Sequence, residues 1–418
     1  MKVLYILNST FALGGATKSF LCLLDGMRKR GEDVHVVVPD EEGVCATLRD
    51  GHIPFTVLNY RPSTYPFHRN IKERLLFLPR LIARRILERR ATKAVQRLIE
   101  KEGFDIIHTN VSVIDIGFKA AQRTHTPHIF HFREFADLDF NTYYFPTPHC
   151  FHKSVKREGS YTISITESIA RHHGLDTYTR GCVIYNGVID EPAPLQPVWG
   201  DYLLYAGRLE RTKGVVDVIK AYADSQVEMP LYLAGAETEP DTSEEIRAII
   251  ATHGLADKVV FLGQRSDVRE LMHHARATLI ASHQEAFGRC MPEAMAESCL
   301  CIAYDSAGTK EQLDLGLQLS GDEIALRYHD TASLVSLITQ VATASLDDFL
   351  PLIQRALQVV NAQYTAEAYV QKVFEVYEKA LPQQPHPVKA SSGTLTPLPE
   401  REGMIPSTAH NLKTHILI

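Results

Sequence analysis

The feature of this sequence that most restricts its fold is a repeated alternation between short apolar runs and segments with helical periodicity. The apolar run at residues 3–7 is followed by a segment in which Ala16, Phe20 and Leu23 share one helical face, and Gly31 ends that segment. A second apolar run follows at residues 34–38. Strands that are joined through helices run parallel within one sheet. The alternation therefore predicts an α/β fold with a parallel, doubly wound sheet.

The alternation occurs in two series. Further strands of the first series are predicted at residues 55–58, 105–108, 128–131, 161–165 and 183–185. Strands of the second series are predicted at residues 202–206, 231–234, 259–262, 277–280 and 300–304. Between the two series, the segment 190–197 is rich in proline and has no periodic pattern, which is typical of a linker.

The length of 418 residues and the hydrophobic content of 45% are sufficient for two domains, each with its own core. We predict a first domain at residues 1–189, a linker at 190–200, a second domain at 201–363 and a C-terminal helix at 364–381. The tail at residues 382–418 mixes Pro, Gln, Ser, Thr and His without a sustained apolar face, so we expect it to be mostly disordered.

Charge and cysteine content exclude several classes of function. A net charge of −6 argues against general nucleic-acid binding, and seven cysteines without a C-x-x-C pair suggest neither a disulfide framework nor a zinc site. The first apolar run is too short for a signal peptide, and no later run is long enough to span a bilayer. The expected localisation is cytoplasmic.

Two glycines, Gly14 and Gly15, follow the first predicted strand and precede a helix. Unobstructed backbone N–H groups and the positive end of a helix suit an anion such as a phosphate. The pair also fits an ordinary tight turn. Because it does not form the G-x-G-x-x-G pattern of dinucleotide sites, a nicotinamide cofactor is disfavoured.

Charged residues follow two strands of the second series. Arg208 and Lys213 lie in the run G-R-L-E-R-T-K-G at residues 207–214, while Glu285 and Glu293 lie eight positions apart after the strand at 277–280. An arginine and a lysine at this spacing can hold one diphosphate, although a merely solvated basic loop is the alternative for that run by itself. Since both runs follow strands of one series, we expect these side chains to face one crevice.

Three runs together resemble the retaining glycosyltransferases of family 4, which have the GT-B fold. They are G-R-L-x-x-x-K-G at 207–214, V-V-F-L-G at 259–263 and E-A-F-G-R-C-M-P-E-A-M-A at 285–296. The likeness continues through the glycine pair, D-I-I-H at 105–108, N-G-V at 186–188 and the helix at 364–381. It implies two Rossmann-like domains whose parallel sheets face each other across a crevice, with the acceptor on the first and the nucleotide-sugar donor on the second.

The resemblance also implies roles for individual residues. Glu293 matches the acid that accepts hydrogen bonds from the ribose hydroxyls, and Glu285 matches the acid beside the hydroxyls of the donor sugar. Arg208 and Lys213 match the cations that hold the diphosphate. Since cleavage of the sugar–phosphate bond places negative charge on the leaving group, fixed cations would stabilise the transition state more than the ground state.

Further residues complete the expected site. His131 ends a strand where the family has a histidine near the donor sugar, and it joins Arg208, Lys213 and Glu285 as a catalytic candidate. The backbone N–H groups of Phe287 and Gly288 are expected to face the phosphates. The remaining expected donor-binding residues are Gly14, Gly15, Gly207, Gln264, Arg289 and Glu293.

The sequence departs from the family pattern at three places. Asn110 follows His108 and Thr109 where a second histidine is common in the family. Arg289 stands where the family usually has an apolar residue, and the segment A-G-T-K-E at 307–311 keeps one glycine of the usual Gly-Gly pair. No metal site is expected, because the arginine and lysine would neutralise the phosphate charge. The implied co-substrate is a UDP- or GDP-linked sugar, and no other cofactor is expected.

A basic segment bears on the acceptor. Residues 69–101 contain eleven Lys or Arg and three Glu. On a helix after Pro79, Leu87, Ala91, Ala94, Val95 and Leu98 would share one face, opposite Arg85, Arg89, Arg90, Lys93 and Arg97. This pattern suits peripheral contact with an anionic membrane, and it equally suits a helix that packs on the sheet with a solvated basic face.

These observations predict a retaining, metal-independent glycosyltransferase that moves a sugar from a nucleotide donor to a glycan or lipid-linked acceptor, in surface polysaccharide or glycolipid synthesis. The expected mechanism is attack on the same face of the sugar, assisted by the leaving phosphate. The alternatives are a nucleotide-sugar epimerase of GT-B fold and a non-catalytic nucleotide-sugar binder.

Overall fold

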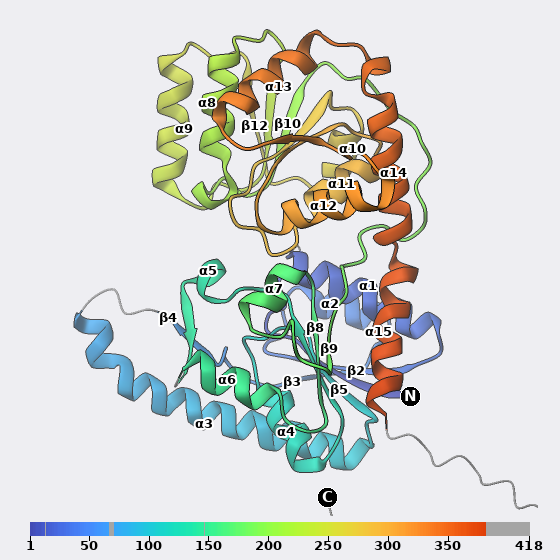
Figure 1. Cartoon of the computed structure of the whole chain (residues 1–418). Coiled ribbons are helices and arrows are strands. Elements are labelled where there is room, and N and C mark those ends of the chain that lie inside the picture. Colours follow the sequence, from blue (N-terminus) through green and yellow to red (C-terminus); the bar gives the residue numbers. More distant parts are fainter. Residues whose placement is uncertain (13, 67–70, 146, 382–418) are drawn as a thin grey trace, which may run out of the picture. The chain divides into compact units, whose positions relative to one another are not determined.

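The computed structural model describes residues 1–12, 14–66, 71–145 and 147–381, and of residues 71–74 and 140 it describes the backbone alone. The predicted disordered tail at 382–418 lies outside the described residues. Two parallel sheets dominate the described chain, each formed by one of the two series found in the sequence (Figure 1).

The first sheet has the strand order β3-β2-β1-β5-β6-β8-β9, and all its pairings are parallel. Its strands are β1 Lys2–Ile6, β2 Asp33–Val38, β3 Phe55–Val57, β5 Ile106–Thr109, β6 His128–Phe132, β8 Ser160–Ser164 and β9 Gly181–Val183. The helices of this series are α1 Gly15–Lys29, α2 Val44–Asp50, α3 Ile71–Glu102, α4 Ile116–Thr124, α5 Asp137–Phe140, α6 Pro148–Val155 and α7 Glu167–His172.

The second sheet has the order β12-β11-β10-β13-β14-β15 and is also parallel. Its strands are β10 Leu203–Ala206, β11 Leu231–Ala234, β12 Val259–Gly263, β13 Ala277–Ile280, β14 Cys301–Tyr304 and β15 Leu326–Tyr328. Its helices are α8 Val215–Ser225, α9 Pro240–Thr252, α10 Val268–His273, α11 Cys290–Ala296, α12 Ala307–Ser320, α13 Thr331–Thr343 and α14 Leu350–Gln363.

Each sheet is covered by helices on both faces, because successive side chains of a strand point to opposite sides. In β1, Tyr5 packs with residues of α1, whereas Ile6 packs with residues of α3 and α4. In β10, Tyr205 packs with α8, α9 and α13, whereas Leu204 packs with α10, α11, α12 and α14. Strands buried on both faces explain the nearly continuous apolar runs in the sequence.

The last described helix, α15 Ala366–Ala380, packs against the first sheet although it follows the second series in the chain (Figure 1). Tyr369, Val373 and Tyr377 lie in one apolar cluster with Tyr5 and residues of α1. A Cβ on Gly26 of α1 would lie 2.3 Å from the side chain of Val370, so the two helices approach closely at a glycine.

The structure differs from the sequence predictions in four elements. Strand β15 was not predicted, and neither was the antiparallel pair of β4 Thr64–Pro66 with β7 Thr142–Tyr144. Helix α3 begins at Ile71 rather than after Pro79, so the proline lies within the helix. Among the described residues, no helix has the length and apolar character required to cross a bilayer.

Candidate active site

A cavity of about 310 Å³ lies where loops from both sheets meet at the carboxyl ends of their strands. Gly15, Ala16 and Lys18 of α1 line it from the first series, together with Arg133 and Asn186. Most of the predicted site residues line it from the second series: Gly207, Lys213, Glu285, Phe287, Gly288, Arg289 and Glu293. The loops at strand ends therefore form one site, as the sequence predicted.

Lys213 and Glu285 form an ion pair at the cavity. The Lys213 Nζ atom lies 2.7 Å from Glu285 Oε2, and each side chain is about three-quarters buried or more, with 21% and 24% exposed. The backbone turn after Lys213 depends on Gly214. Gly214 has a φ of 72°, and a Cβ there would lie 2.0 Å from the carbonyl oxygen of Ala281, so only glycine fits this turn of the G-R-L-x-x-x-K-G run.

Glu285 and Glu293 converge on the cavity even though eight positions separate them. Glu285 lies in the loop after β13, and Glu293 lies within α11. Gly288 reverses the chain between them with a φ of 80°. Among the described residues, the backbone N–H groups of Phe287 and Gly288 have no protein acceptor, which leaves them available to an anion.

Arg289, between Glu285 and Glu293 in the chain, connects this segment to residues of the first series. Its Nη1 donates to Ser19 Oγ and to the carbonyl of Gly187, both at 2.9 Å, while its Nε donates to Glu293 Oε1 at 3.1 Å. The arginine at this unusual position thus engages the carboxylate that was expected to bind ribose. Ribose hydroxyls would have to share Glu293 with Arg289.

Helix α1 presents its N-terminus to the cavity. Its N-cap is Gly14, which supplies no side-chain cap, so the first N–H groups of the helix lack a capping acceptor. Gly15 and Ala16 at this end line the cavity. The positive end of a fifteen-residue helix is a suitable site for phosphate oxygens.

Four predicted residues lie elsewhere. Arg208 does not line the cavity, since its side chain is 59% exposed and pairs with Glu210 at 2.6 Å. Gln264 is exposed, and Gly14 is the N-cap of α1 and does not line the cavity. His131 is fully buried and is not part of the cavity lining.

His131 belongs to a buried polar chain that fixes its protonation. A guanidinium can only donate hydrogen bonds. Since Arg133 Nη2 lies 3.2 Å from His131 Nδ1, this nitrogen accepts and the ring proton sits on Nε2. His108 Nε2, at 3.2 Å from the same nitrogen, also donates, and the hydroxyl of Tyr377 donates to His108 Nδ1 at 2.6 Å.

The pKa of His131 is well below its usual value because of burial and the charge of Arg133, so the ring is neutral. Within the described chain, His131 Nε2 has no hydrogen-bond partner. Arg133 itself donates to the side chain of Asn186 at 2.5 Å and to the hydroxyl of Tyr369 at 2.8 Å. The sequence analysis missed Arg133, whose signal was a cation directly after a predicted strand.

A second group next to this strand has a shifted pKa. Burial raises the pKa of Glu134 to about 7, although the carboxylate accepts hydrogen bonds from Ser112 N and Oγ, each at 2.7 Å. The carboxyl of Asp139, in α5, also has a raised pKa because of burial, and the charges of Lys213 and Glu285 act on it. Asp139 of the first series therefore lies within electrostatic range of the Lys213–Glu285 pair.

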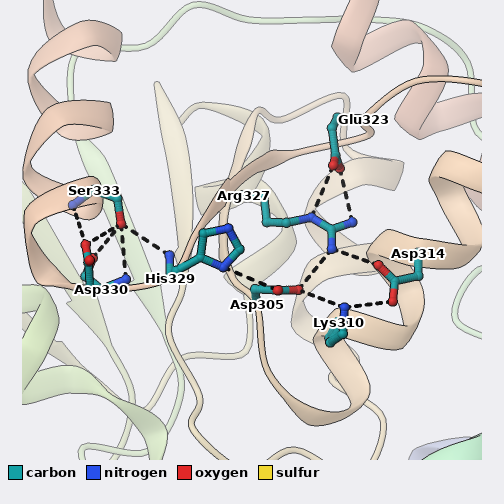
Figure 2. Close-up of polar contacts among 8 residues, drawn as sticks. All are labelled: Asp305, Lys310, Asp314, Glu323, Arg327, His329, Asp330 and Ser333. Atoms are coloured by element: carbon teal, nitrogen blue, oxygen red, sulfur yellow. Dashed lines mark hydrogen bonds and ion pairs between the residues drawn. The ribbon is translucent and has the colours of Figure 1, made fainter.

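The loop after β14 is held by a network of ion pairs (Figure 2). Arg327 Nη1 of β15 contacts Asp305 at 3.0 Å and Asp314 at 2.7 Å, and Lys310 bridges the same two carboxylates at 3.7 and 3.0 Å. The network fixes the start of α12, where Gly308 N donates to the carbonyl of Glu285 at 2.9 Å. The network thereby stabilises the segment that bonds to the backbone of Glu285.

The described residues contain no group of three or more His, Cys, Asp or Glu side chains that could hold a metal ion. The charges at the cavity come instead from Lys213, Arg133, Arg289 and Lys18, and from the carboxylates of Glu285 and Glu293. This set can hold a diphosphate and the hydroxyl groups of a sugar.

Comparison with known proteins identifies the family. Residues 195–322 match the model of glycosyl transferases group 1, and residues 14–176 match the glycosyl transferase 4-like domain. Together these matches cover more than half of the chain.

Among curated proteins, the uncharacterized glycosyltransferase YqgM of Bacillus subtilis (strain 168) is 27% identical over 207 residues, which are 46% of this chain and 52% of that protein. The N-acetyl-alpha-D-glucosaminyl L-malate synthase of Bacillus anthracis is 31% identical over 116 residues, which are 27% of this chain and 30% of that protein. The matches thus span about half the length of these relatives or less.

The structure of Anabaena Alr3699/HepE in complex with UDP and glucose has a TM-score of 0.71 with this chain at 19% identity, and the alignment covers 91% of this chain and 100% of HepE. This likeness confirms the predicted GT-B fold, in which two α/β domains each contain a parallel sheet. By its sequence matches and its fold, the chain belongs to the GT-B glycosyltransferases of the family 4 type.

Proposed function

We propose that this protein transfers a sugar from a UDP- or GDP-linked donor to a glycan or lipid-linked acceptor, with retention of anomeric configuration and without a metal ion. The observation that carries the proposal is the cavity in which Lys213 and Glu285 lie opposite the uncapped N-terminus of α1. The HepE structure holds UDP and glucose, and this supports a nucleotide sugar as the partner of the present chain.

In the proposed mechanism, the diphosphate lies between the N-terminus of α1, the N–H groups of Phe287 and Gly288, and the ammonium of Lys213. Negative charge grows on the leaving phosphate as the bond to the sugar breaks, so these fixed donors stabilise the transition state more than the bound donor. Arg208 is proposed as a second cation for the same phosphates, which would require its side chain to leave Glu210.

Glu285 is proposed to accept hydrogen bonds from donor-sugar hydroxyls, and Glu293 from the ribose. His131, neutral and protonated on Nε2, is proposed to donate one hydrogen bond toward the sugar, which would require the cavity to extend to this buried nitrogen. The leaving phosphate would take the proton of the attacking acceptor hydroxyl on the same face of the sugar ring, so no protein carboxylate is needed as a covalent nucleophile. We propose that this reaction serves surface polysaccharide or glycolipid synthesis in the cytoplasm, at the inner face of a membrane.

The test is a screen of nucleotide sugars with measurement of nucleoside diphosphate release in the presence of oligosaccharide or lipid-linked acceptors. Lys213→Gln should lower kcat by about 100-fold, as loss of one donor to a developing anion typically does. Arg211→Gln is the matched control, because Arg211 lies in the same loop but pairs with Glu245 away from the cavity.

Three results would contradict the proposal. Equal activity of the Lys213 variant and its control would remove Lys213 from the reaction. Conversion of the donor to an isomeric nucleotide sugar would support the epimerase alternative, and donor binding without any transfer would support the non-catalytic one. The anomeric configuration of the product, measured by NMR, tests retention.

A further inference from the structure

Helix α3 exposes a stripe of large aliphatic side chains. Leu75, Leu78, Ile82 and Ile86 are between 45% and 73% exposed, which is unusual for leucine and isoleucine. Their spacing of three, four and four residues places them on one face of the helix. We call these four residues the α3 stripe.

The same face continues as a basic surface toward the end of the helix. Arg89, Arg90, Lys93 and Arg97 follow the stripe at helical spacing, and all four are exposed. Between Leu75 and Arg97 the one acid is Glu88, which turns inward and bonds to Arg85 and Lys119. The outward face of α3 is therefore apolar in its first half and positively charged in its second half.

The opposite face of α3 already holds the helix in place. Arg84 donates to the carbonyl of Thr64 at 2.9 Å and lies over the ring of Tyr65, and Phe77 packs against Tyr65 with ring centres 5.9 Å apart. Further along, Ala91 and Val95 are buried in the core. Folding of α3 onto the first sheet thus leaves the stripe uncovered.

This arrangement corrects one part of the sequence prediction. Arg85 was expected on the free basic face, but it is half-buried, pairs with Glu88 at 2.7 Å and lies over the ring of Phe145. Arg89, Arg90, Lys93 and Arg97 are exposed as expected. The sequence analysis did not identify the apolar stripe, and its helix start after Pro79 left out Leu75 and Leu78.

We propose that the outward face of α3 lies in the surface of an anionic membrane, with the α3 stripe among the acyl chains and the four cations against lipid headgroups. A helix that is apolar in one part and basic in the next suits this position. A second copy of the chain is a poorer occupant, since pairing the same face of two molecules would bring like charges together or set cations against the stripe.

The proposal deepens the proposed function, and it rests on that function only for the suggestion that the acceptor is lipid-linked. A path of packing contacts, strand pairing and chain connectivity links α3 to the cavity. α3 packs on Tyr65 of β4, β4 pairs with β7, and β7 directly follows α5, whose Asp139 is influenced by Lys213 and Glu285. A membrane-bound α3 would therefore hold the acceptor side of the cavity close to lipids.

The experiment is co-sedimentation of the full chain with vesicles of phosphatidylcholine alone or of phosphatidylcholine with phosphatidylglycerol, at low and high salt. Leu78→Ser/Ile82→Ser removes the centre of the stripe without adding charge. Leu317→Ser/Leu319→Ser is the matched control, because these leucines are also exposed but lie on α12. Arg89→Gln/Lys93→Gln tests the cations, and circular dichroism melts verify folding.

We expect the wild type and the α12 control to bind the anionic vesicles at least 10-fold more tightly than the neutral ones. The stripe variant should lose at least 10-fold in affinity at both salt concentrations, whereas the cation variant should lose affinity mainly at low salt, because screening already weakens its contribution at high salt. This salt pattern separates apolar insertion from purely electrostatic attraction.

Equal binding of the stripe variant and the wild type would overturn the proposal, and so would equal binding to both vesicle types. A wild-type dimer that becomes monomeric in the stripe variant during analytical ultracentrifugation would instead assign the stripe to a second copy. Nucleoside diphosphate release with a soluble acceptor, measured on the same variants, is independent of vesicle binding. It therefore distinguishes failure of this proposal from failure of the proposed function.

Discussion

Acid should destabilise this protein through four buried histidines. His108, His128, His131 and His173 are at most 1% exposed. Burial lowers the pKa of His128 and of His173 to about 3, and burial together with the charge of Arg133 holds the pKa of His108 and of His131 well below 6.5. As the pH falls below 6.5, these side chains bind protons in the unfolded chain and not in the folded one, so unfolding becomes more favourable.

The size of the effect follows from these pKa values. From about pH 7 to about pH 5, each histidine that stays neutral when folded lowers the free energy of unfolding by about 2 kcal/mol. Glu134 acts in the opposite direction, because its raised pKa of about 7 lets the folded protein bind a proton before the unfolded chain does. This offsets about 2 kcal/mol, and the net loss is about 6 kcal/mol, comparable to the whole stability of many domains.

Urea unfolding measured through the fluorescence of Trp199, the one tryptophan of the sequence, tests this at both pH values. His128→Gln should reduce the loss of unfolding free energy between the two pH values by about 2 kcal/mol. His253→Gln makes the same chemical change at an exposed position and serves as the control. Equal stability at both pH values, or an equal loss in the His128 variant and the wild type, would refute the reasoning.

Three further predictions concern the cavity and its support. Glu293→Ala should weaken nucleotide binding, measured by calorimetry. Glu285→Ala should slow sugar transfer more than it weakens binding of the nucleotide alone. Equal effects of the two substitutions on nucleotide binding would show that the two roles are wrongly assigned. Donor turnover should persist in the presence of EDTA. If EDTA abolished turnover and magnesium or manganese restored it, the reaction would depend on a metal. Arg327→Ala should lower the free energy of unfolding by about 2 kcal/mol, because it leaves the largely buried Asp305 without its strongest partner. The control Arg265→Ala, at an exposed ion pair, should lower it by less than about 0.5 kcal/mol. Similar losses in the two variants would argue against a supporting role for the network in Figure 2.

The sequence predicted the buried parallel strands well, because strands covered on both faces need uninterrupted apolar runs. β13 was predicted at residues 277–280 and lies at Ala277–Ile280. The missed strand β15 has the sequence L-R-Y and lies at the edge of its sheet, where its central arginine reaches Asp305. Short edge strands depend on tertiary pairing and carry little pattern of their own. The same reason applies to β4 and β7.

Within the site, the convergence of Lys213, Glu285 and Glu293 could be predicted, because Lys213 and Glu285 follow strands of the same sheet and Glu293 lies in the helix after Glu285. The sequence could not show that the Arg208 side chain pairs with Glu210, since an exposed arginine can point either into the cavity or toward a neighbouring carboxylate. Nor could it identify Arg133, whose partners Asn186 and Tyr369 lie 53 and 236 positions away. The contact with Tyr369 follows from the return of α15 to the first sheet, which no local pattern encodes.

The loss of one glycine at residues 307–311 has a visible consequence. Ala307, at the position of the first glycine of the family's pair, has a φ of 43°, in the left-handed region that side chains disfavour. Gly308, the other residue of the pair, is restricted for a different reason, because a Cβ there would lie 2.6 Å from the carbonyl oxygen of Glu285. Position 307 is thus restricted by its backbone angle, and position 308 by the lack of space for a side chain.

Two substitutions separate these constraints. Ala307→Gly should raise the free energy of unfolding by about 1 kcal/mol, since relief of the left-handed strain exceeds the entropy that glycine loses on folding. Gly308→Ala should lower it by about 2 kcal/mol or more and should also reduce transfer, because the chain that carries Glu285 must move to admit the methyl group. Urea unfolding and nucleoside diphosphate release measure the two effects. A destabilised Ala307→Gly variant would show that the positive φ at this position is not a source of strain, and a fully active Gly308→Ala variant would show that the loop holding Glu285 tolerates displacement.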